Sequence, residues 1–227
     1  MTALVIIGSG GHGREALDII EAINARSPTF EFLGFIDDRR DNESLVTARG
    51  ARILGPLDTL RGIDARYVIG IGSGDIRRRL DRELTEWGYE AAVLVHPAAT
   101  IGAAVTLGAG SVVAAGARIT TNVMFGRHAH LNVNASVSHD CRIGDYVTVS
   151  PGVTVCGNVT IGEGTLMGAG STVIQNRTIG TWVTVGAGAA VVSDLADRVT
   201  AVGVPARPRP GAIAFSADRV APTRQEP

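Results

Sequence analysis

The chain has 227 residues, of which 45% are hydrophobic and 19% are charged, so it can form one large domain or two small ones with a substantial core. The formal net charge of -1 gives no general attraction to nucleic acid or to an anionic membrane. No apolar run approaches the roughly 20 residues that span a bilayer. Its two cysteines, Cys141 and Cys156, provide no disulfide framework, and we expect a reducing, cytoplasmic location.

The first part of the chain alternates short apolar runs with amphipathic stretches. Its opening run ends at Gly8 and predicts a buried strand rather than a signal peptide. The predicted strands are 4–7, 30–36 and 67–71, and the predicted helices are 14–24 and 76–87. Strands that alternate with helices imply a parallel sheet, so residues 1–92 are predicted to form a small, Rossmann-like α/β domain.

A glycine-rich segment, Gly-Ser-Gly-Gly-His-Gly at 8–13, lies between the first predicted strand and helix. Such glycines let backbone N–H groups and a helix N-terminus approach a phosphate. A dinucleotide site and tight turns without a ligand both remain open. We favour a nucleotide-sugar pocket, because 90 residues make only about half of a two-lobed dinucleotide fold.

From Val95 to Val191 a large apolar residue recurs at every sixth position without a break, at 17 positions in all. A small or β-branched residue follows most of them four positions later, and glycine is frequent beside them. A period of six fits a short strand, a corner and another short strand, and three such units make a coil of 18 residues. A β-sandwich would have to produce this register by coincidence. Residues 93–210 are therefore predicted to form a parallel β-helix, and 211–227, which lack the period, a mobile tail.

Four segments ahead of or at the start of this repeat carry a resemblance to a known family: Gly-Ser-Gly-Gly-His-Gly, Phe-Ile-Asp-Asp, Ile-Gly-Ser-Gly-Asp-Ile-Arg (71–77) and His96-Pro97. In this order they resemble the nucleotide-sugar N-acetyltransferases of the bacillosamine, perosamine and viosamine type, and also the sialic acid O-acetyltransferases that share their hexapeptide-repeat architecture. The resemblance implies a left-handed β-helix and a homotrimer. It also implies that the small domain holds a nucleotide-linked sugar and that acetyl-CoA binds between neighbouring helices.

One histidine, His139 in Val-Ser-His-Asp (137–140), is a candidate general base. It stands at a hexad position that points out of the prism, and an imidazole suits proton removal from an attacking amine or hydroxyl. Asp140 can orient it, but neighbouring residues on a strand point to opposite faces, so the pair requires a corner. Gly157, one coil later, should lie beside His139, leave room for a thioester and offer an N–H to the oxyanion. Neither cysteine has the surroundings of a nucleophile, which favours direct attack on the thioester.

The motifs and the resemblance together assign further residues. The predicted substrate-binding residues are Gly11, His12, Gly13, Asp37, Asp38, Ser73, Arg77 and Asn132. The predicted acetyl-CoA-binding residues are Thr148, Gly157, Ala169, Ala187, Gly203 and Pro205. Thr148 stands where the family commonly has a histidine, and a threonine donates one hydrogen bond but carries no charge.

Three functions follow from this pattern. The first is N-acetylation of a nucleotide-linked 4-amino-4,6-dideoxy sugar, the second O-acetylation of a sialic acid or related sugar, and the third nucleotide-sugar binding without catalysis. The intact His139, Asp140 and Gly157 argue against the third. His128 and His130 offer two imidazoles for zinc, but no third ligand can be placed, and no metal is expected. An Asp accepts from uracil, thymine or guanine alike, so the base, the sugar and the pathway stay open.

Overall fold

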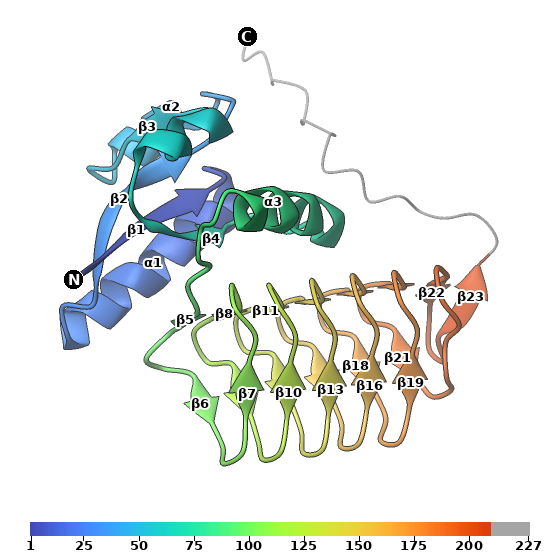
Figure 1. Cartoon of the computed structure of the whole chain (residues 1–227). Helices are drawn as coiled ribbons and strands as arrows, with labels where there is room; N and C mark the ends of the chain where they lie inside the picture. Colours follow the sequence, from blue (N-terminus) through green and yellow to red (C-terminus); the bar gives the residue numbers. More distant parts are fainter. Residues whose placement is uncertain (210–227) are drawn as a thin grey trace, which may run out of the picture.

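The computed structural model describes residues 1–209, so the tail predicted at 211–227 lies outside the described residues. A small α/β domain rests on one corner of a long prism of short strands (Figure 1). Helix α3 lies along the prism, because its first turn contacts the coil at Gly164 while Asp81, farther along, contacts the coil at His128. Within the described residues, no helix has the combined length and apolarity of a transmembrane span.

The N-terminal domain is a four-stranded parallel sheet with the order β3-β2-β1-β4. Its strands are β1 Thr2–Ile7, β2 Phe30–Ile36, β3 Ile53–Gly55 and β4 Arg66–Ile69, and its helices are α1 Gly11–Arg26, α2 Glu43–Thr47, the 3-10 helix η1 Leu57–Gly62 and α3 Gly74–Glu86. Apolar side chains of β1 and β4 are fully buried between α1 on one face of the sheet and α3 on the other. The parallel α/β domain predicted from the sequence is confirmed.

Three elements of this domain were not predicted. They are α2, β3 and η1, which contain five, three and six residues. Elements this short show less than two full periods of hydrophobicity, so periodicity does not reveal them. Strand β3 forms because its backbone pairs with the edge of β2, which is a tertiary contact.

The second part is a three-sided parallel β-helix. We call its sheets face 1, face 2 and face 3 in the order in which the chain visits them. Face 1 contains β5 Leu94–Val95, β8 Val112–Val113, β11 His130–Leu131, β14 Thr148–Val149, β17 Leu166–Met167, β20 Thr184–Val185, β22 Thr200–Val202 and β23 Arg207–Arg209. Face 2 contains β6 Thr100–Ile101, β9 Arg118–Ile119, β12 Ser136–Val137, β15 Thr154–Val155, β18 Thr172–Val173 and β21 Ala190–Val191. Face 3 contains β7 Thr106–Leu107, β10 Met124–Phe125, β13 Arg142–Ile143, β16 Thr160–Ile161 and β19 Thr178–Ile179.

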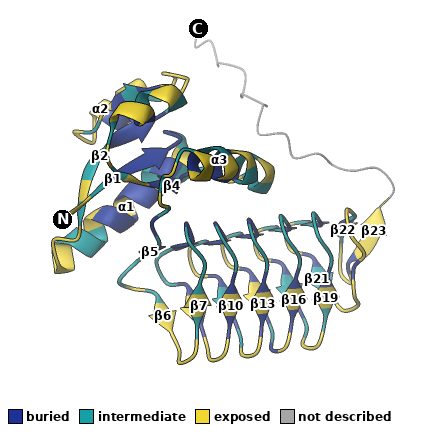
Figure 2. Cartoon of the chain, in the orientation of Figure 1, coloured by how far each residue is buried: buried dark blue, intermediate teal, exposed yellow. Residues whose placement is uncertain are grey.

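Strands on each face pair in parallel with those one coil away, as Leu131 does with Val113 and Val149, except that β23 pairs antiparallel with β22. The hexad side chains fill the interior, and Val137 and Ile143 are buried as expected (Figure 2). The prediction fails at the first coil, where Ile101 is 40% exposed. This side chain ends its sheet, so no preceding coil covers it.

The corners of the prism carry residues with left-handed backbone. The corner between faces 2 and 3, corner 2/3, has positive φ at Asn122, Asp140, Asn158 and Asn176. Asparagine and aspartate tolerate this conformation better than other non-glycine residues. The corner between faces 3 and 1, corner 3/1, places His128, Tyr146 and Trp182 in the same conformation. Bulky residues are unusual there, and these three lie against the N-terminal domain.

Candidate active site

The imidazole of His139 and the carboxylate of Asp140 form a pair on corner 2/3. Nδ1 of His139 lies 2.8 Å from Oδ2 of Asp140. The side chain of His139 is 59% exposed and that of Asp140 is 50% exposed. Asp140 has a φ of 60°, which turns the chain at this residue and lets two neighbours share one side. Adjacent residues on a strand would point to opposite faces, but the turn at Asp140 lets His139 and Asp140 contact each other.

Gly157 lies directly beneath this imidazole in the next coil. A Cβ at position 157 would stand 2.4 Å from Cε1 and 2.5 Å from Nε2 of His139, so only glycine leaves the ring where it is. The Gly157 N–H donates to no acceptor within residues 1–209. Gly157, with an N–H that is unpaired within the described residues, thus lies in the coil next to the His139 ring.

Asn122, which sequence reasoning missed, holds the other oxygen of Asp140. Its Nδ2 lies 2.5 Å from Oδ1 of Asp140. The hydrogen bond from Asn122, followed by that from His139, lowers the pKa of Asp140 below its ordinary value. The 18-residue separation of Asn122 and Asp140 is one coil, and this spacing is the sequence signal that could have found it.

A cavity of about 550 Å³ opens at the carboxyl ends of β1, β2 and β4 in the N-terminal domain. Four of the predicted substrate-binding residues line it: Gly11, His12, Asp37 and Asp38. Ligands of open α/β sheets bind beyond the carboxyl ends of the strands. A larger hollow of about 810 Å³ lies at the opposite edge of the sheet, beside Thr2 and Arg66, and contains none of the predicted residues.

The two acids that follow β2 have different surroundings. Asp37 accepts bonds from the backbone N–H and hydroxyl of Ser9 and from the N–H of Arg39. Burial favours the neutral form of Asp37, but these donors outweigh it and lower the pKa. Asp38 is exposed and has no side-chain partner within the described residues. Asp37 therefore fixes the glycine-rich loop, whereas Asp38 is available to a ligand.

His12 joins the cavity to the β-helix. Its Nε2 lies 2.8 Å from Nδ1 of His130 on face 1, and its Nδ1 lies 3.1 Å from Glu15. Complete burial, with the nearby charge of Arg77, holds the pKa of His130 well below its usual value, so this ring is neutral. Sequence reasoning considered His130 only as a metal ligand, because nothing local relates residues 118 positions apart.

Arg77, predicted to bind substrate, is fully buried between the two domains. Its guanidinium donates to backbone oxygens of Ile71 and Gly72 in its own domain and of His128 and Tyr146 on corner 3/1. Burial lowers the pKa of Arg77 to about 9, which leaves the side chain charged at neutral pH. Because its donors are committed to this interface, the structure gives Arg77 a positioning role in place of substrate contact.

Thr148, predicted to bind acetyl-CoA, belongs to the same interface. Its hydroxyl accepts from Nη2 of Arg77 at 2.9 Å and donates to the oxygen of Gly72 at 3.1 Å. The side chain is 6% exposed. Because the only proton of this hydroxyl is used between the domains, Thr148 has no side-chain donor left for a coenzyme in this arrangement.

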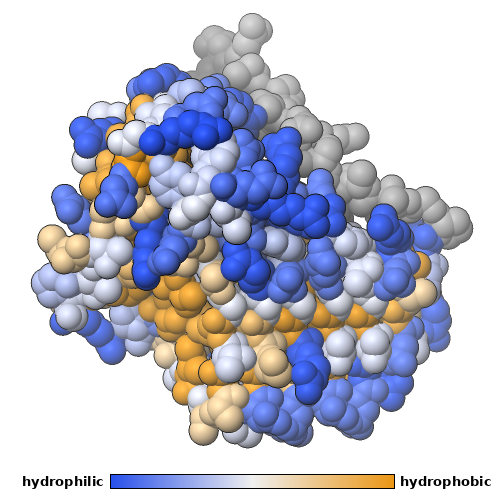
Figure 3. Space-filling view, viewed as in Figure 1, coloured by the Kyte–Doolittle hydropathy of each residue, from blue (hydrophilic) through white to orange (hydrophobic). Residues whose placement is uncertain are grey.

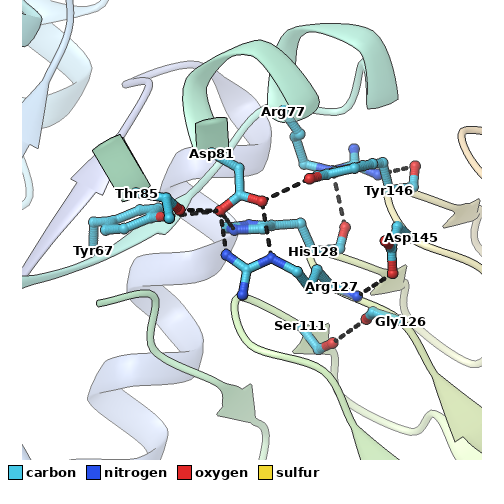
Figure 4. A network of polar contacts seen from close by, with 10 residues as sticks. All are labelled: Tyr67, Arg77, Asp81, Thr85, Ser111, Gly126, Arg127, His128, Asp145 and Tyr146. Carbon is cyan, nitrogen blue, oxygen red and sulfur yellow. Dashed lines mark hydrogen bonds and ion pairs between the residues drawn. The ribbon is translucent and has the colours of Figure 1, made fainter. Parts of the chain in front are cut away.

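A second polar network surrounds Asp81 of α3 (Figure 4). This carboxylate accepts from the hydroxyls of Tyr67 and Tyr146 at 2.8 and 2.6 Å and from Arg127 at 2.5 Å, and it lies 2.9 Å from Nε2 of His128. Burial alone would raise the pKa of Asp81, but the contacts with His128, Arg127 and Tyr146 hold it well below its usual range. The network and Arg77 together fix the orientation of the cavity relative to the prism.

The remaining predicted residues lie apart from the pair on corner 2/3. Asn132 directly follows β11 on face 1, where its amide donates to Val149 O at 3.0 Å. Ser73 caps α3, and Gly13 packs so closely on Gly8 that a Cβ would lie 2.0 Å from its carbonyl oxygen. Ala169 and Ala187 are exposed on corner 1/2, between faces 1 and 2, and Gly203 and Pro205 form the turn between β22 and β23. Within residues 1–209, no three His, Cys, Asp or Glu side chains are grouped as a metal site.

Comparisons with known proteins show the fold and the family of this chain. Residues 3–84 match the family model described as the PglD N-terminal domain. The chain is 30% identical to GDP-perosamine N-acetyltransferase of Escherichia coli O157:H7 over 64% of this chain and 66% of that protein, and 37% identical to UDP-N-acetylbacillosamine N-acetyltransferase of Bacillus subtilis over 51% and 52%. PerB of Caulobacter crescentus, solved in complex with CoA and GDP-perosamine, superimposes with a TM-score of 0.82 at 33% identity, covering 92% of this chain and 98% of that one.

A β-helix with an accessible His–Asp pair above a glycine, joined to a small α/β domain, defines an acyltransferase of the hexapeptide-repeat class. The superposition on PerB confirms the left-handed coil that the resemblance implied. The chain belongs to the nucleotide-sugar N-acetyltransferases of the perosamine and bacillosamine type. Its alignments span about half to two thirds of the length of the curated relatives it matches.

Proposed function

We propose that this protein transfers the acetyl group of acetyl-CoA to the amine of a nucleotide-linked amino sugar, with His139 as the general base. The observation that carries this proposal is the position of the His139 ring above Gly157, with Asp140 at its inner nitrogen. The PerB structure contains CoA and GDP-perosamine, which supports both substrate classes. A 4-amino-4,6-dideoxyhexose is the acceptor that the family resemblance favours.

The cavity in the N-terminal domain is the proposed nucleotide site. Helix α1 starts at Gly11 with no side-chain cap and no acid in its first turn, so its free N–H groups and dipole favour the diphosphate. His12 lies on the same turn, where Glu15 and His130 engage its two ring nitrogens, so its backbone N–H is the group that it offers the diphosphate. The free carboxylate of Asp38 lines this cavity and would accept hydrogen bonds from N–H groups of the base.

The chemistry follows from the two nitrogens of His139. Asp140 accepts a hydrogen bond from Nδ1–H, so the proton stays on Nδ1 and the lone pair of Nε2 is free. The sugar amine attacks the thioester carbonyl, Nε2 removes the ammonium proton that develops, and the Gly157 N–H stabilises the oxyanion. Collapse of the tetrahedral intermediate breaks the C–S bond, and the imidazolium returns the proton to the CoA thiolate.

The cavity and His139 lie on opposite sides of one chain. His12 at the cavity contacts His130 on face 1, whereas His139 lies on corner 2/3, which is the corner opposite face 1. A sugar in the cavity of one chain therefore cannot reach the imidazole of the same chain. This supports a homotrimer in which the cavity of one copy faces His139 of a neighbour, as the resemblance implies.

The surface of the prism is consistent with such packing. An apolar band follows the coils over β7 to β19 and is bordered by polar residues (Figure 3). Met124 on face 3 is 48% exposed, and Val133 on corner 1/2 is 41% exposed. Acetyl-CoA between copies would run from His139 and Gly157 of one chain along Ala169 and Ala187 of the next, with Gly203 and Pro205 at the end of the groove.

The activity is tested by release of CoA thiol from acetyl-CoA with GDP-, UDP- and dTDP-linked 4-amino sugars and with sialic acid. Thiol release with an amino sugar supports the proposal, whereas release with sialic acid alone identifies an O-acetyltransferase. His139→Ala should lower kcat by about 10²–10⁴-fold, while His96→Ala, which removes an imidazole at the start of the prism, should not. Full activity of His139→Ala at pH 7 would refute the role of the base.

The shared site is tested by mixing two inactive proteins. Gly11→Trp fills the cavity, because the space around Gly11 is open, and leaves His139 intact. Refolding Gly11→Trp with His139→Ala in equal amounts should restore about one quarter of the activity, since random assembly pairs a sound cavity with a sound imidazole at that frequency. No recovery in mixed trimers of confirmed mass would place both functions in one chain.

A further inference from the structure

Asn122 occupies the corner position one coil before Asp140. Both residues have left-handed backbone, with φ values of 57° and 60°, and the 18-residue coil stacks their side chains. Oδ1 of Asp140 accepts from Nδ2 of Asn122 at 2.5 Å, and Oδ2 lies 2.8 Å from Nδ1 of His139. Each oxygen of this carboxylate thus has one partner, and the two partners come from different coils.

A half-exposed carboxylate with a single partner can rotate about its side-chain bonds. The amide of Asn122 prevents this, because its own backbone is held to the preceding coil by the bond from Asn122 N to Ala103 O at 3.0 Å. The hydrogen bond from the Asn122 amide also favours the ionised form of Asp140 and, with that from His139, lowers its pKa. An ionised and immobile Asp140 keeps the proton of His139 on Nδ1 and the free Nε2 over Gly157.

The residue type at position 122 fits this task. Left-handed backbone favours asparagine, aspartate or glycine. Aspartate would oppose Asp140 with a like charge, and glycine would offer no donor. Farther along the same corner, Asn158 donates its side-chain amide to Asn176 at 2.7 Å with the same backbone conformation, and this pair is hydrogen-bonded to neither the Asp140 carboxylate nor the His139 ring. The amide contact thus recurs without a link to the carboxylate that orients His139, which provides an internal control.

We propose that Asn122 is a positioning residue for acetyl transfer, acting through Asp140 on the orientation of His139. The proposal rests on the proposed role of His139 as the base and extends the pair into a chain of three residues. Asn122 touches no reacting atom. Its substitution should change kcat and the pH dependence of kcat, and leave the KM values for both substrates unchanged.

The test compares Asn122→Ala with Asn176→Ala. Both place alanine at a left-handed φ and remove one amide contact, so both should lower the melting temperature by a similar amount. Only Asn122→Ala should lower kcat, by about threefold to tenfold, which is typical of losing a hydrogen bond to a charged group at a solvated site. In a His139→Ala background Asn122→Ala should cause no further loss.

A charge variant gives a readout that a purely structural role would not move. Asn122→Asp adds a negative charge near the imidazole and should shift the acid limb of the kcat profile upward by about half a pH unit, whereas Asn176→Asp should leave the profile in place. Wild-type kcat and pH profile in both Asn122 variants, with His139→Ala inactive, would overturn the inference. Activity of His139→Ala would instead overturn the proposed function itself.

Discussion

The substitution Gly157→Ala adds one methyl group beneath the imidazole of His139. The new Cβ would stand 2.4 Å from Cε1 of His139, whereas ordinary contacts begin at 3.4 Å, so the ring must move by about 1 Å. Gly157 is not among the glycines with positive φ, so its backbone accepts alanine without strain. His139 is exposed on its outer side and can swing away, and this motion breaks its contact with Asp140.

The expected result is a loss of activity with little loss of stability. A misplacement of about 1 Å costs on the order of 10²-fold in rate, and a glycine-to-alanine change at a permissive position alters stability by at most about 1 kcal/mol. Thiol-release kinetics should therefore show kcat reduced by about 10²-fold, while thermal unfolding stays near that of the wild type. Gly62→Ala, in open space and also without positive φ, is the matched control.

The double variant Gly157→Ala/His139→Ala separates displacement of the ring from other effects. If the methyl group acts only by moving the imidazole, the double variant should be no slower than His139→Ala alone. An additional loss would indicate that the methyl group also blocks the thioester or disturbs the Gly157 N–H. Wild-type kcat in Gly157→Ala would refute the reasoning, because the ring could not then be held at the observed place.

Three further expectations concern the cavity and the domain interface. Asp38→Ala should raise KM for the sugar nucleotide and leave the melting temperature unchanged. Asp37→Ala should lower both the affinity for the sugar nucleotide and the melting temperature, because the Ser9 loop loses its hydrogen bonds to Asp37. Equal behaviour of the two variants would contradict the assignment of Asp38 to the ligand and of Asp37 to the loop. Arg77→Met should destabilise the protein in denaturant unfolding by about 1–3 kcal/mol for each buried carbonyl oxygen that it leaves unpaired. The pKa of Asp81 is lowered in the folded state, so its contribution to stability is present above its unfolded pKa of about 4 and is lost as the pH falls through and below that value. Asp81→Asn should therefore flatten the acid side of the curve of unfolding free energy against pH, and an unchanged slope would contradict this.

The repeating part of the molecule could be predicted from the sequence because every coil repeats the same local environment. The hexad residues Leu131, Val137 and Ile143 had to be buried once a period of six was recognised, and the 18-residue coil placed Gly157 beside His139. The same rule would have placed Asn122 beside Asp140 had it been applied backward along the chain.

The contacts between the two domains follow no repeat in the sequence. The contact between His12 and His130 joins residues 118 positions apart, and the burial of Arg77 depends on carbonyl oxygens that corner 3/1 presents to α3. A motif therefore suggested substrate contact for Arg77, and only the packed interface showed that its donors are already used. By itself the sequence determined the coil, the parallel α/β domain and the place of Gly157 beside His139, since these follow from spacing along the chain. The tertiary structure decided which polar residues face a ligand and which hold the domains together, because that choice depends on contacts between segments that share no sequence pattern.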